Sequence, residues 1–113
     1  MFTGMSENKL HSDCYLWFHA SYPDLRGLLC YNLNNSRNKI QAIMDKALGL
    51  QKGRCDMVFY YNGVATMIEF KTEEGRQTPD QKKWQGIIET GGFRYEIIRS
   101  LEDFQQLIRS III

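Results

Sequence analysis

The dipeptide Asn62-Gly63, which separates two strand-like runs, constrains the fold of this chain more than any other feature. Residues 56–61 and 64–71 are rich in aromatic and aliphatic side chains, as buried strands are. An Asn-Gly pair between two such runs is the strongest short-range indication of a β-hairpin, because both residues tolerate the positive φ of a type I′ turn. The sequence therefore predicts a hairpin with a two-residue turn.

The register of this hairpin gathers three charged side chains. With a two-residue turn, Tyr61 faces Val64, and Asp56 then faces Glu69 on the neighbouring strand. Lys71 lies two residues beyond Glu69 and shares its face of the sheet. Opposed carboxylates destabilise a sheet, so a positive group must compensate them. Lys71 can supply one charge, and Mg²⁺ or Mn²⁺, which prefer oxygen ligands, can supply more. The alternative is an ion network with no metal.

The two faces of the hairpin differ in character. One face is almost wholly apolar and is expected to be buried, with Met57, Phe59, Tyr61, Val64, Thr66, Ile68 and Phe70. The other face carries the charged cluster at one end and is otherwise formed by Val58, Tyr60, Ala65 and Met67. Both faces are therefore expected to be covered, and the charges are expected to lie at the margin of a core.

Helical and strand-like patterns flank the hairpin on both sides. In chain order we expect a helix over 7–21, a strand over 28–31, a helix over 39–48, the hairpin, a helix from Pro79 to Gly91, a strand over 93–98 and a helix from Leu101 onward. This order predicts an α/β fold, a mixed β-sheet with a central hairpin flanked by helices. A chain of 113 residues is expected to form a single domain, over residues 1–113.

For two polar residues of the predicted helices, the sequence allows either a role at the charged cluster or a role at the end of the helix. Glu7 lies one turn before Leu10 on the apolar stripe of the first helix, so its carboxylate is expected on the core side; the alternative is an acid favoured by the helix dipole. Gln81 lies at the third position of its helix, on the face shared with Trp84, Gln85 and Ile88. One role for it is a capping box with Thr78, the other is a place in the site, and its amide could serve both. On that helix Trp84, Ile87 and Ile88 are expected to point inward.

Composition excludes several classes of protein. With 43% hydrophobic and 24% charged residues the chain is neither disordered nor able to span a membrane. Three cysteines without a CxxC pair favour a reducing compartment, and the first residues show no export signal. The net charge of +1 hides a local excess, because residues 37–54 contain five basic residues and one acid. That stretch suits a polyanion, or it is simply a solvated face.

The charged residues of the hairpin match a known signature. Asp56 and the run Glu69-Phe70-Lys71 resemble the D…(D/E)xK pattern of the PD-(D/E)xK nuclease superfamily. The surrounding sequence is more closely similar to the VRR-NUC family, through residues 49–56, 68–71, Gly75, Thr78, Gln81, Trp84 and Gly91 or Gly92. The resemblance extends over about residues 5–110. Cys55 departs from the family pattern, which usually has Pro before the Asp.

The resemblance implies a restriction-endonuclease-like core and a metal-dependent DNA endonuclease. It implies that Asp56, Glu69 and the Phe70 backbone carbonyl bind Mg²⁺ or Mn²⁺, with Glu7 as a further candidate ligand. It implies that Lys71 orients or activates the attacking water and that Gln81 shapes the site. The basic residues expected to contact DNA are Arg37, Lys39, Lys52, Arg54 and Arg76.

Partners and setting follow from the same resemblance. It implies double-stranded or branched DNA, such as a flap or a four-way junction, a role in DNA repair or recombination, and a phage-type homodimer. The apolar end of the last helix, Ile111-Ile112-Ile113, is one candidate dimer interface, and docking on the sheet is the alternative. The expected compartment is the cytoplasm, of a host cell if the chain is phage-encoded, with no membrane partner.

Two other functions remain open. A non-catalytic nucleic-acid-binding module would use the basic 37–54 stretch without a metal. A structural or interaction protein would use the charged cluster only as an ion network. Zinc chemistry is disfavoured, since the chain has only His11 and His19 and no cysteine at ligand spacing.

Overall fold

A computed structural model describes residues 6–33 and 38–112 of the chain. One sheet has the strand order β1-β2-β3-β4, in which the first two pairings are antiparallel and β3 pairs with β4 in parallel. The strands are β1 (Leu29–Tyr31), β2 (Met57–Tyr61), β3 (Val64–Phe70) and β4 (Arg94–Ile98). The helices are α1 (Glu7–Ser21), the short 3₁₀ helix η1 (Pro23–Leu25), α2 (Lys39–Ala47), α3 (Pro79–Thr90) and α4 (Leu101–Ile111). The predicted order of elements and the mixed α/β fold are therefore confirmed, with boundaries within one residue of those expected.

The β2–β3 hairpin has the predicted turn and register. Asn62 and Gly63 have φ values of 53° and 77°, the positive values of a type I′ turn. Tyr61 pairs with Val64, and the ladder extends to the pair Met57 and Ile68. The expected pairing of Asp56 with Glu69 is wrong: β2 begins at Met57, so Asp56 lies just outside the ladder, at the entrance to the strand.

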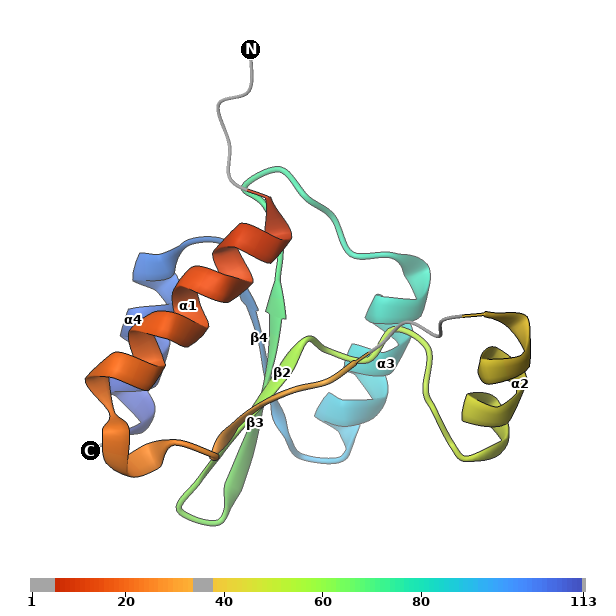
Figure 1. The fold of residues 1–113 in the computed structure, drawn as a ribbon, viewed down its shortest axis with the longest axis horizontal. Helices are drawn as coiled ribbons and strands as arrows, with labels where there is room; N and C mark the ends of the chain where they lie inside the picture. Colours follow the sequence, from red (N-terminus) through yellow and green to blue (C-terminus); the bar gives the residue numbers. More distant parts are fainter. Residues whose placement is uncertain (1–5, 34–37, 113) are drawn as a thin grey trace.

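Two hydrophobic cores cover the two faces of the sheet. Figure 1 shows α1 and α4 on one side and α3 on the other. The first core is rich in aromatic rings, and Phe18, Phe59 and Phe104 are among its fully buried members. The second core is smaller and contains Cys55, Val58, Met67, Trp84 and Tyr95. The middle of the sheet is therefore buried, whereas most of the edge strand β1 is exposed, and so is Tyr60, on a hairpin face that was expected to be covered.

Two side chains expected in the core are exposed instead. Val64 is 58% exposed, because the hairpin turn extends beyond the helices that cover the rest of this face. Ile87 is 56% exposed, because it lies on the side of α3 that faces α2 rather than the sheet. The expectations of burial for these two residues are wrong.

The loop before β2 packs tightly against the start of α3. Gly53 has a φ of +74°, and a Cβ atom at this position would lie 2.3 Å from the backbone of Asp80. Only glycine fits both the backbone conformation and the space. This contact fixes the path of the chain into Asp56.

Among residues 6–33 and 38–112, no helix has the length and apolar character to cross a membrane.

Candidate active site

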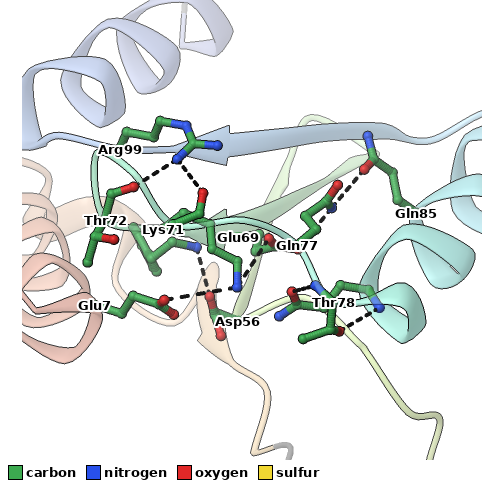
Figure 2. A network of polar contacts seen from close by, with 12 residues as sticks. Glu7, Asp56, Glu69, Lys71, Thr72, Gln77, Thr78, Gln85 and Arg99 are labelled. Carbon is green, nitrogen blue, oxygen red and sulfur yellow. Dashed lines mark hydrogen bonds and ion pairs between the residues drawn. The ribbon is translucent and has the colours of Figure 1, made fainter.

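Charged side chains from separate elements meet where β2 begins and β3 ends. Figure 2 shows Glu7 reaching from α1, Asp56 from the residue before β2, Glu69 from β3 and Lys71 from the residue after it. The Nζ atom of Lys71 lies 3.9 Å from Oε2 of Glu7 and 4.0 Å from Oε2 of Glu69. The structure thus brings together the four charged residues that the sequence singled out. It does so at the margin of the core, as the alternation of the hairpin predicts.

Glu69 is a buried carboxylate with two unequal oxygens. Glu69 is only 1% exposed to solvent. Oε1 accepts hydrogen bonds from the Tyr95 hydroxyl and from Nε2 of Gln77, the latter at 3.3 Å. Oε2 is buried and has no hydrogen-bond partner among residues 6–33 and 38–112. An unsatisfied buried acceptor costs about 1–3 kcal/mol, and more when it is charged, so such an atom in a native fold calls for an explanation.

Asp56 is held at the entrance to β2 by the backbone of the next strand. Its Oδ2 accepts a hydrogen bond of 2.7 Å from the Phe70 amide. Burial raises the pKa of Asp56 above its ordinary value, and the charges of Glu69 and Glu7 raise it further. The Phe70 hydrogen bond and the charge of Lys71 lower the pKa of Asp56 in part. The pKa of Asp56 is therefore raised first by burial, and the negative charges of Glu69 and Glu7 add to that effect.

Lys71 is the cation at the centre of this group. It is 5% exposed, which is unusual for a lysine, whereas the side chain of Glu7 is about half exposed. Both ion-pair distances of Lys71 exceed hydrogen-bonding range. Its amine therefore balances the charge of the acids without occupying Oε2 of Glu69.

Gln81 takes the capping role that the sequence left open. Its side-chain oxygen accepts a hydrogen bond of 2.8 Å from the Thr78 backbone N–H, and its own N–H donates to Thr78 Oγ1. The capping box of α3 is therefore complete. In the part of the chain that the structure describes, the hydrogen bonds of Gln81 outside the helix backbone are to Thr78, so a role in the site stays a prediction.

The donor atoms fit an oxygen-preferring divalent cation. In the described residues no three His, Cys, Asp or Glu side chains form a ready metal-binding group. Mg²⁺, however, is usually bound through one or two carboxylates and keeps several waters or substrate phosphate oxygens. Oε2 of Glu69 is a buried carboxylate oxygen near Asp56 that has no hydrogen-bond partner within the described ranges. This pair matches that incomplete type of site, whereas it does not match a closed structural zinc site.

The residues expected to contact DNA have different environments. Lys39, Lys52 and Arg76 are exposed. Arg54 is partly buried, and its Nη2 donates to the Leu33 carbonyl oxygen at 3.0 Å, so part of its role is to fix the backbone. Arg37 lies outside the described residues.

A groove of about 1000 Å³ lies between α2 and α3. Its lining is mixed: apolar side chains of both helices alternate with the polar residues Lys46, Gln51, Lys52, Asp80 and Lys83. No residue of α2 is buried, and the apolar side chains along it and just after it are strongly exposed: Ile40 73%, Ile43 71%, Met44 53% and Leu48 83%. Lys83 was missed in the sequence, since its own helix gives no sign that it would face α2.

Tyr95 and Gln77 were also missed in the sequence, although both contact Glu69. Tyr95 reaches it because β4 pairs in parallel with β3, which places Tyr95 opposite Met67 on the face of Glu69. Burial raises the pKa of the Tyr95 hydroxyl, and so does its hydrogen bond to Glu69, so the hydroxyl remains a donor. His11, by contrast, is a packing residue: its ring stacks on Phe70 with centroids 4.8 Å apart.

The fold, unlike the sequence, is similar to known proteins. No family model matches the chain, and no curated protein matches it. A solved structure described as a "VRR_NUC domain protein" has a TM-score of 0.79 to this chain, over 98% of this chain and 91% of that one, at 16% identity. The chain has a VRR_NUC fold. A second solved structure, described as a "VRR_NUC domain", has a TM-score of 0.58 over 87% of this chain and 92% of that one, at 18% identity.

The VRR_NUC fold confirms the expected restriction-endonuclease-like architecture. Cys55, which stands where the family usually has Pro, is fully buried beside the site. Its Sγ donates to the Met57 carbonyl oxygen at 3.2 Å, and burial raises the pKa of its thiol to about 11. At neutral pH Cys55 is therefore a neutral packing residue at the start of β2, and Asp56 still reaches the end of β3.

Proposed function

We propose that this VRR_NUC-fold chain is a metal-dependent DNA endonuclease of the PD-(D/E)xK type, with one nuclease domain over residues 1–113. The observation that carries the proposal is the buried Oε2 of Glu69, which lacks a hydrogen-bond partner among the described residues and lies beside Lys71 and Asp56. A fold does not by itself define an activity, and this donor set is what favours a nuclease over other uses of the fold.

The proposed cation is Mg²⁺ or Mn²⁺, held by Asp56, Glu69 and the Phe70 carbonyl, with Glu7 as a further ligand. Such an ion, when bound, lowers the pKa of a coordinated water and offsets negative charge on the scissile phosphate. Lys71 is proposed to hold the attacking water and to stabilise the charge that develops on the phosphate oxygens. Its buried position favours this role, because an amine acts more strongly in a site with little water. Gln81 is proposed to shape the edge of the site from the start of α3.

The proposed substrate is double-stranded or branched DNA, such as a flap or a four-way junction, met in repair or recombination. Exposed basic residues support a polyanionic substrate: Lys39, Lys52 and Arg76, with Lys46 and Lys83 at the α2–α3 groove. Arg54 and Arg37 belong to the same proposal. Phosphate contacts of this kind give affinity but little sequence preference.

A homodimer is the proposed assembly, of the phage type that the sequence resembles. Ile111 and Ile112 pack against the first core, so docking of the last helix within the chain explains their apolar character. Ile113 lies outside the described residues. The exposed apolar face of α2 is therefore the better candidate for the contact. Light scattering on the purified chain tests the assembly, and a monomer at micromolar concentration would contradict it. The proposed compartment is the cytoplasm, because three cysteines without a CxxC pair favour a reducing environment.

A cleavage assay with labelled DNA tests the proposed function. Duplex, single-stranded, flap and four-way substrates are incubated with Mg²⁺, Mn²⁺ or EDTA. We expect cleavage with either metal and none in EDTA. Glu69→Gln should slow cleavage at least ~100-fold, because it removes an anionic ligand while the Tyr95 hydroxyl can still bond to the amide. Glu74→Gln, at an exposed position in the next loop, is the matched control.

Two results would contradict the proposal. Cleavage that survives in EDTA or in Glu69→Gln would indicate a contaminating nuclease. DNA binding without cleavage in any metal would favour the non-catalytic nucleic-acid-binding module instead.

A further inference from the structure

In the part of the chain that the structure describes, the side-chain hydrogen bonds to Glu69 are all made to one of its two carboxylate oxygens. The Tyr95 hydroxyl and Nε2 of Gln77 both donate to Oε1. Oε2 is left without a partner and lies on the side of Lys71. A buried carboxylate with two available donors would be expected to share them between its oxygens if the fold served only to satisfy it. The distribution is instead one-sided.

Both donors are themselves held in place. The Tyr95 ring lies in the second core, edge-on to Trp84 with centroids 6.0 Å apart, so the direction of its hydroxyl is set by packing. The same Nε2 of Gln77 donates at 2.8 Å to the side-chain oxygen of Gln85 on α3. Figure 2 shows this chain of contacts from Gln85 through Gln77 to Glu69. The donors therefore restrict the rotation of the Glu69 carboxylate.

The donors are also neutral. An arginine or lysine in either position would cancel the charge of Glu69 and compete with a cation. The phenol of Tyr95 and the amide of Gln77 orient the carboxylate without neutralising its negative charge, so that charge can still attract a cation. Groups that orient a metal ligand in this way commonly change metal affinity when removed.

We infer that Tyr95 and Gln77 are positioning residues, which direct Oε2 of Glu69 toward the divalent cation. The inference rests on the proposed function and extends it to two residues outside the signature. Tyr95 has the larger part, because its hydroxyl is buried and rigid. Gln77 has the smaller part, because its contact with Glu69 is long and its Nε2 is shared.

The test is Mn²⁺ binding to the whole chain without DNA, measured by calorimetry and by the metal-induced rise in melting temperature. Tyr95→Phe removes one hydroxyl and keeps the ring. We expect its Mn²⁺ dissociation constant to rise about 10–100-fold. Gln77→Met should give a smaller rise in the same direction. Tyr60→Phe, an exposed position on β2, is the matched control and should bind Mn²⁺ as the wild type does.

A purely structural role would lower the melting temperature in EDTA without changing the Mn²⁺ dissociation constant. Such a result in Tyr95→Phe and Gln77→Met, with tight binding by the wild type, would overturn this inference and leave the proposed function standing. A wild type that binds no Mn²⁺ would overturn the proposed function and this inference with it. In a Glu69→Gln background, Tyr95→Phe should have no further effect on Mn²⁺ binding, and an undiminished effect there would also overturn the inference.

Discussion

Lys71→Met is expected to abolish cleavage and yet to bind Mn²⁺ at least as tightly as the wild type. Methionine preserves the buried hydrocarbon volume and removes the charge. Loss of a positive group that stabilises the reacting phosphate should slow cleavage by about 100-fold or more. Metal binding should not suffer, because the amine of Lys71 lies 4.0 Å from Oε2 of Glu69 and repels a second cation there. This separation of binding from chemistry is the signature of the role proposed for Lys71.

The same substitution should make the stability of the protein depend on metal. Without Lys71, Glu69 remains as a buried charge with no opposite charge beside it. Removing one partner of a buried pair costs on the order of 3 kcal/mol of unfolding free energy. Denaturant unfolding in EDTA should show this loss, and saturating Mn²⁺ should restore much of it, since binding to the native state stabilises it.

Lys82→Met, at an exposed position on α3, is the control for both measurements. It should leave cleavage, metal binding and stability unchanged. Cleavage by Lys71→Met at the wild-type rate would exclude Lys71 from the reaction. Weaker Mn²⁺ binding would mean that the lysine supports the cation rather than competing with it.

Asp56→Asn is expected to inactivate the protein and to stabilise it when metal is absent. The pKa of Asp56 is raised by burial and by the neighbouring acids, so this carboxyl group ionises less readily in the native state than in the unfolded chain. Ionised Asp56 therefore costs stability at neutral pH. Asparagine removes that charge and keeps an oxygen for the Phe70 N–H. The melting temperature of Asp56→Asn in EDTA at pH 7 should lie above that of the wild type.

The sign of the pH dependence is fixed by the direction of the shift. Below the unfolded pKa of an aspartate, about 4, both states of the wild type are protonated and the advantage of Asp56→Asn should vanish. As the pH rises from there through the folded pKa, the wild type loses stability relative to the variant. Saturating Mn²⁺ should reverse the order of the two proteins, because only the wild type keeps both anionic ligands.

Thermal unfolding between about pH 4 and pH 8, with and without Mn²⁺, checks this prediction. Asp24→Asn, at an exposed position in η1, is the control and should show neither effect. A variant less stable than the wild type in EDTA at neutral pH would mean that the Asp56 charge is satisfied by the fold alone, and a metal would no longer be needed to explain it.

Local signals account for what the sequence could predict of the fold and the site. The Asn62-Gly63 turn fixed the hairpin register, and that register placed Glu69 and Lys71 on one face near Asp56. Side-chain caps are equally local, which is why the start of α3 was predicted correctly. Contacts that depend on distant pairing could not be predicted in this way. Tyr95 reaches Glu69 because β4 pairs in parallel with β3. The whole of α3 lies between these two strands in the sequence, so no local pattern gives their register.

The sequence also could not predict which apolar residues would be exposed. Helical spacing identified α2, but the spacing carries no information on whether a partner surface exists within the chain. The structure leaves Ile43 and Ile87 exposed across the groove between α2 and α3. Val64 shows the same limit at a turn, where strand alternation continues past the edge of the covering helices.

The most direct test of the account is the position of Mn²⁺ in crystals of the wild-type protein, located by anomalous scattering. The account predicts a peak about 2.0–2.3 Å from Oε2 of Glu69, with a carboxylate oxygen of Asp56 in the same coordination shell. No peak at saturating Mn²⁺, or a peak elsewhere with Oε2 still unliganded, would contradict it.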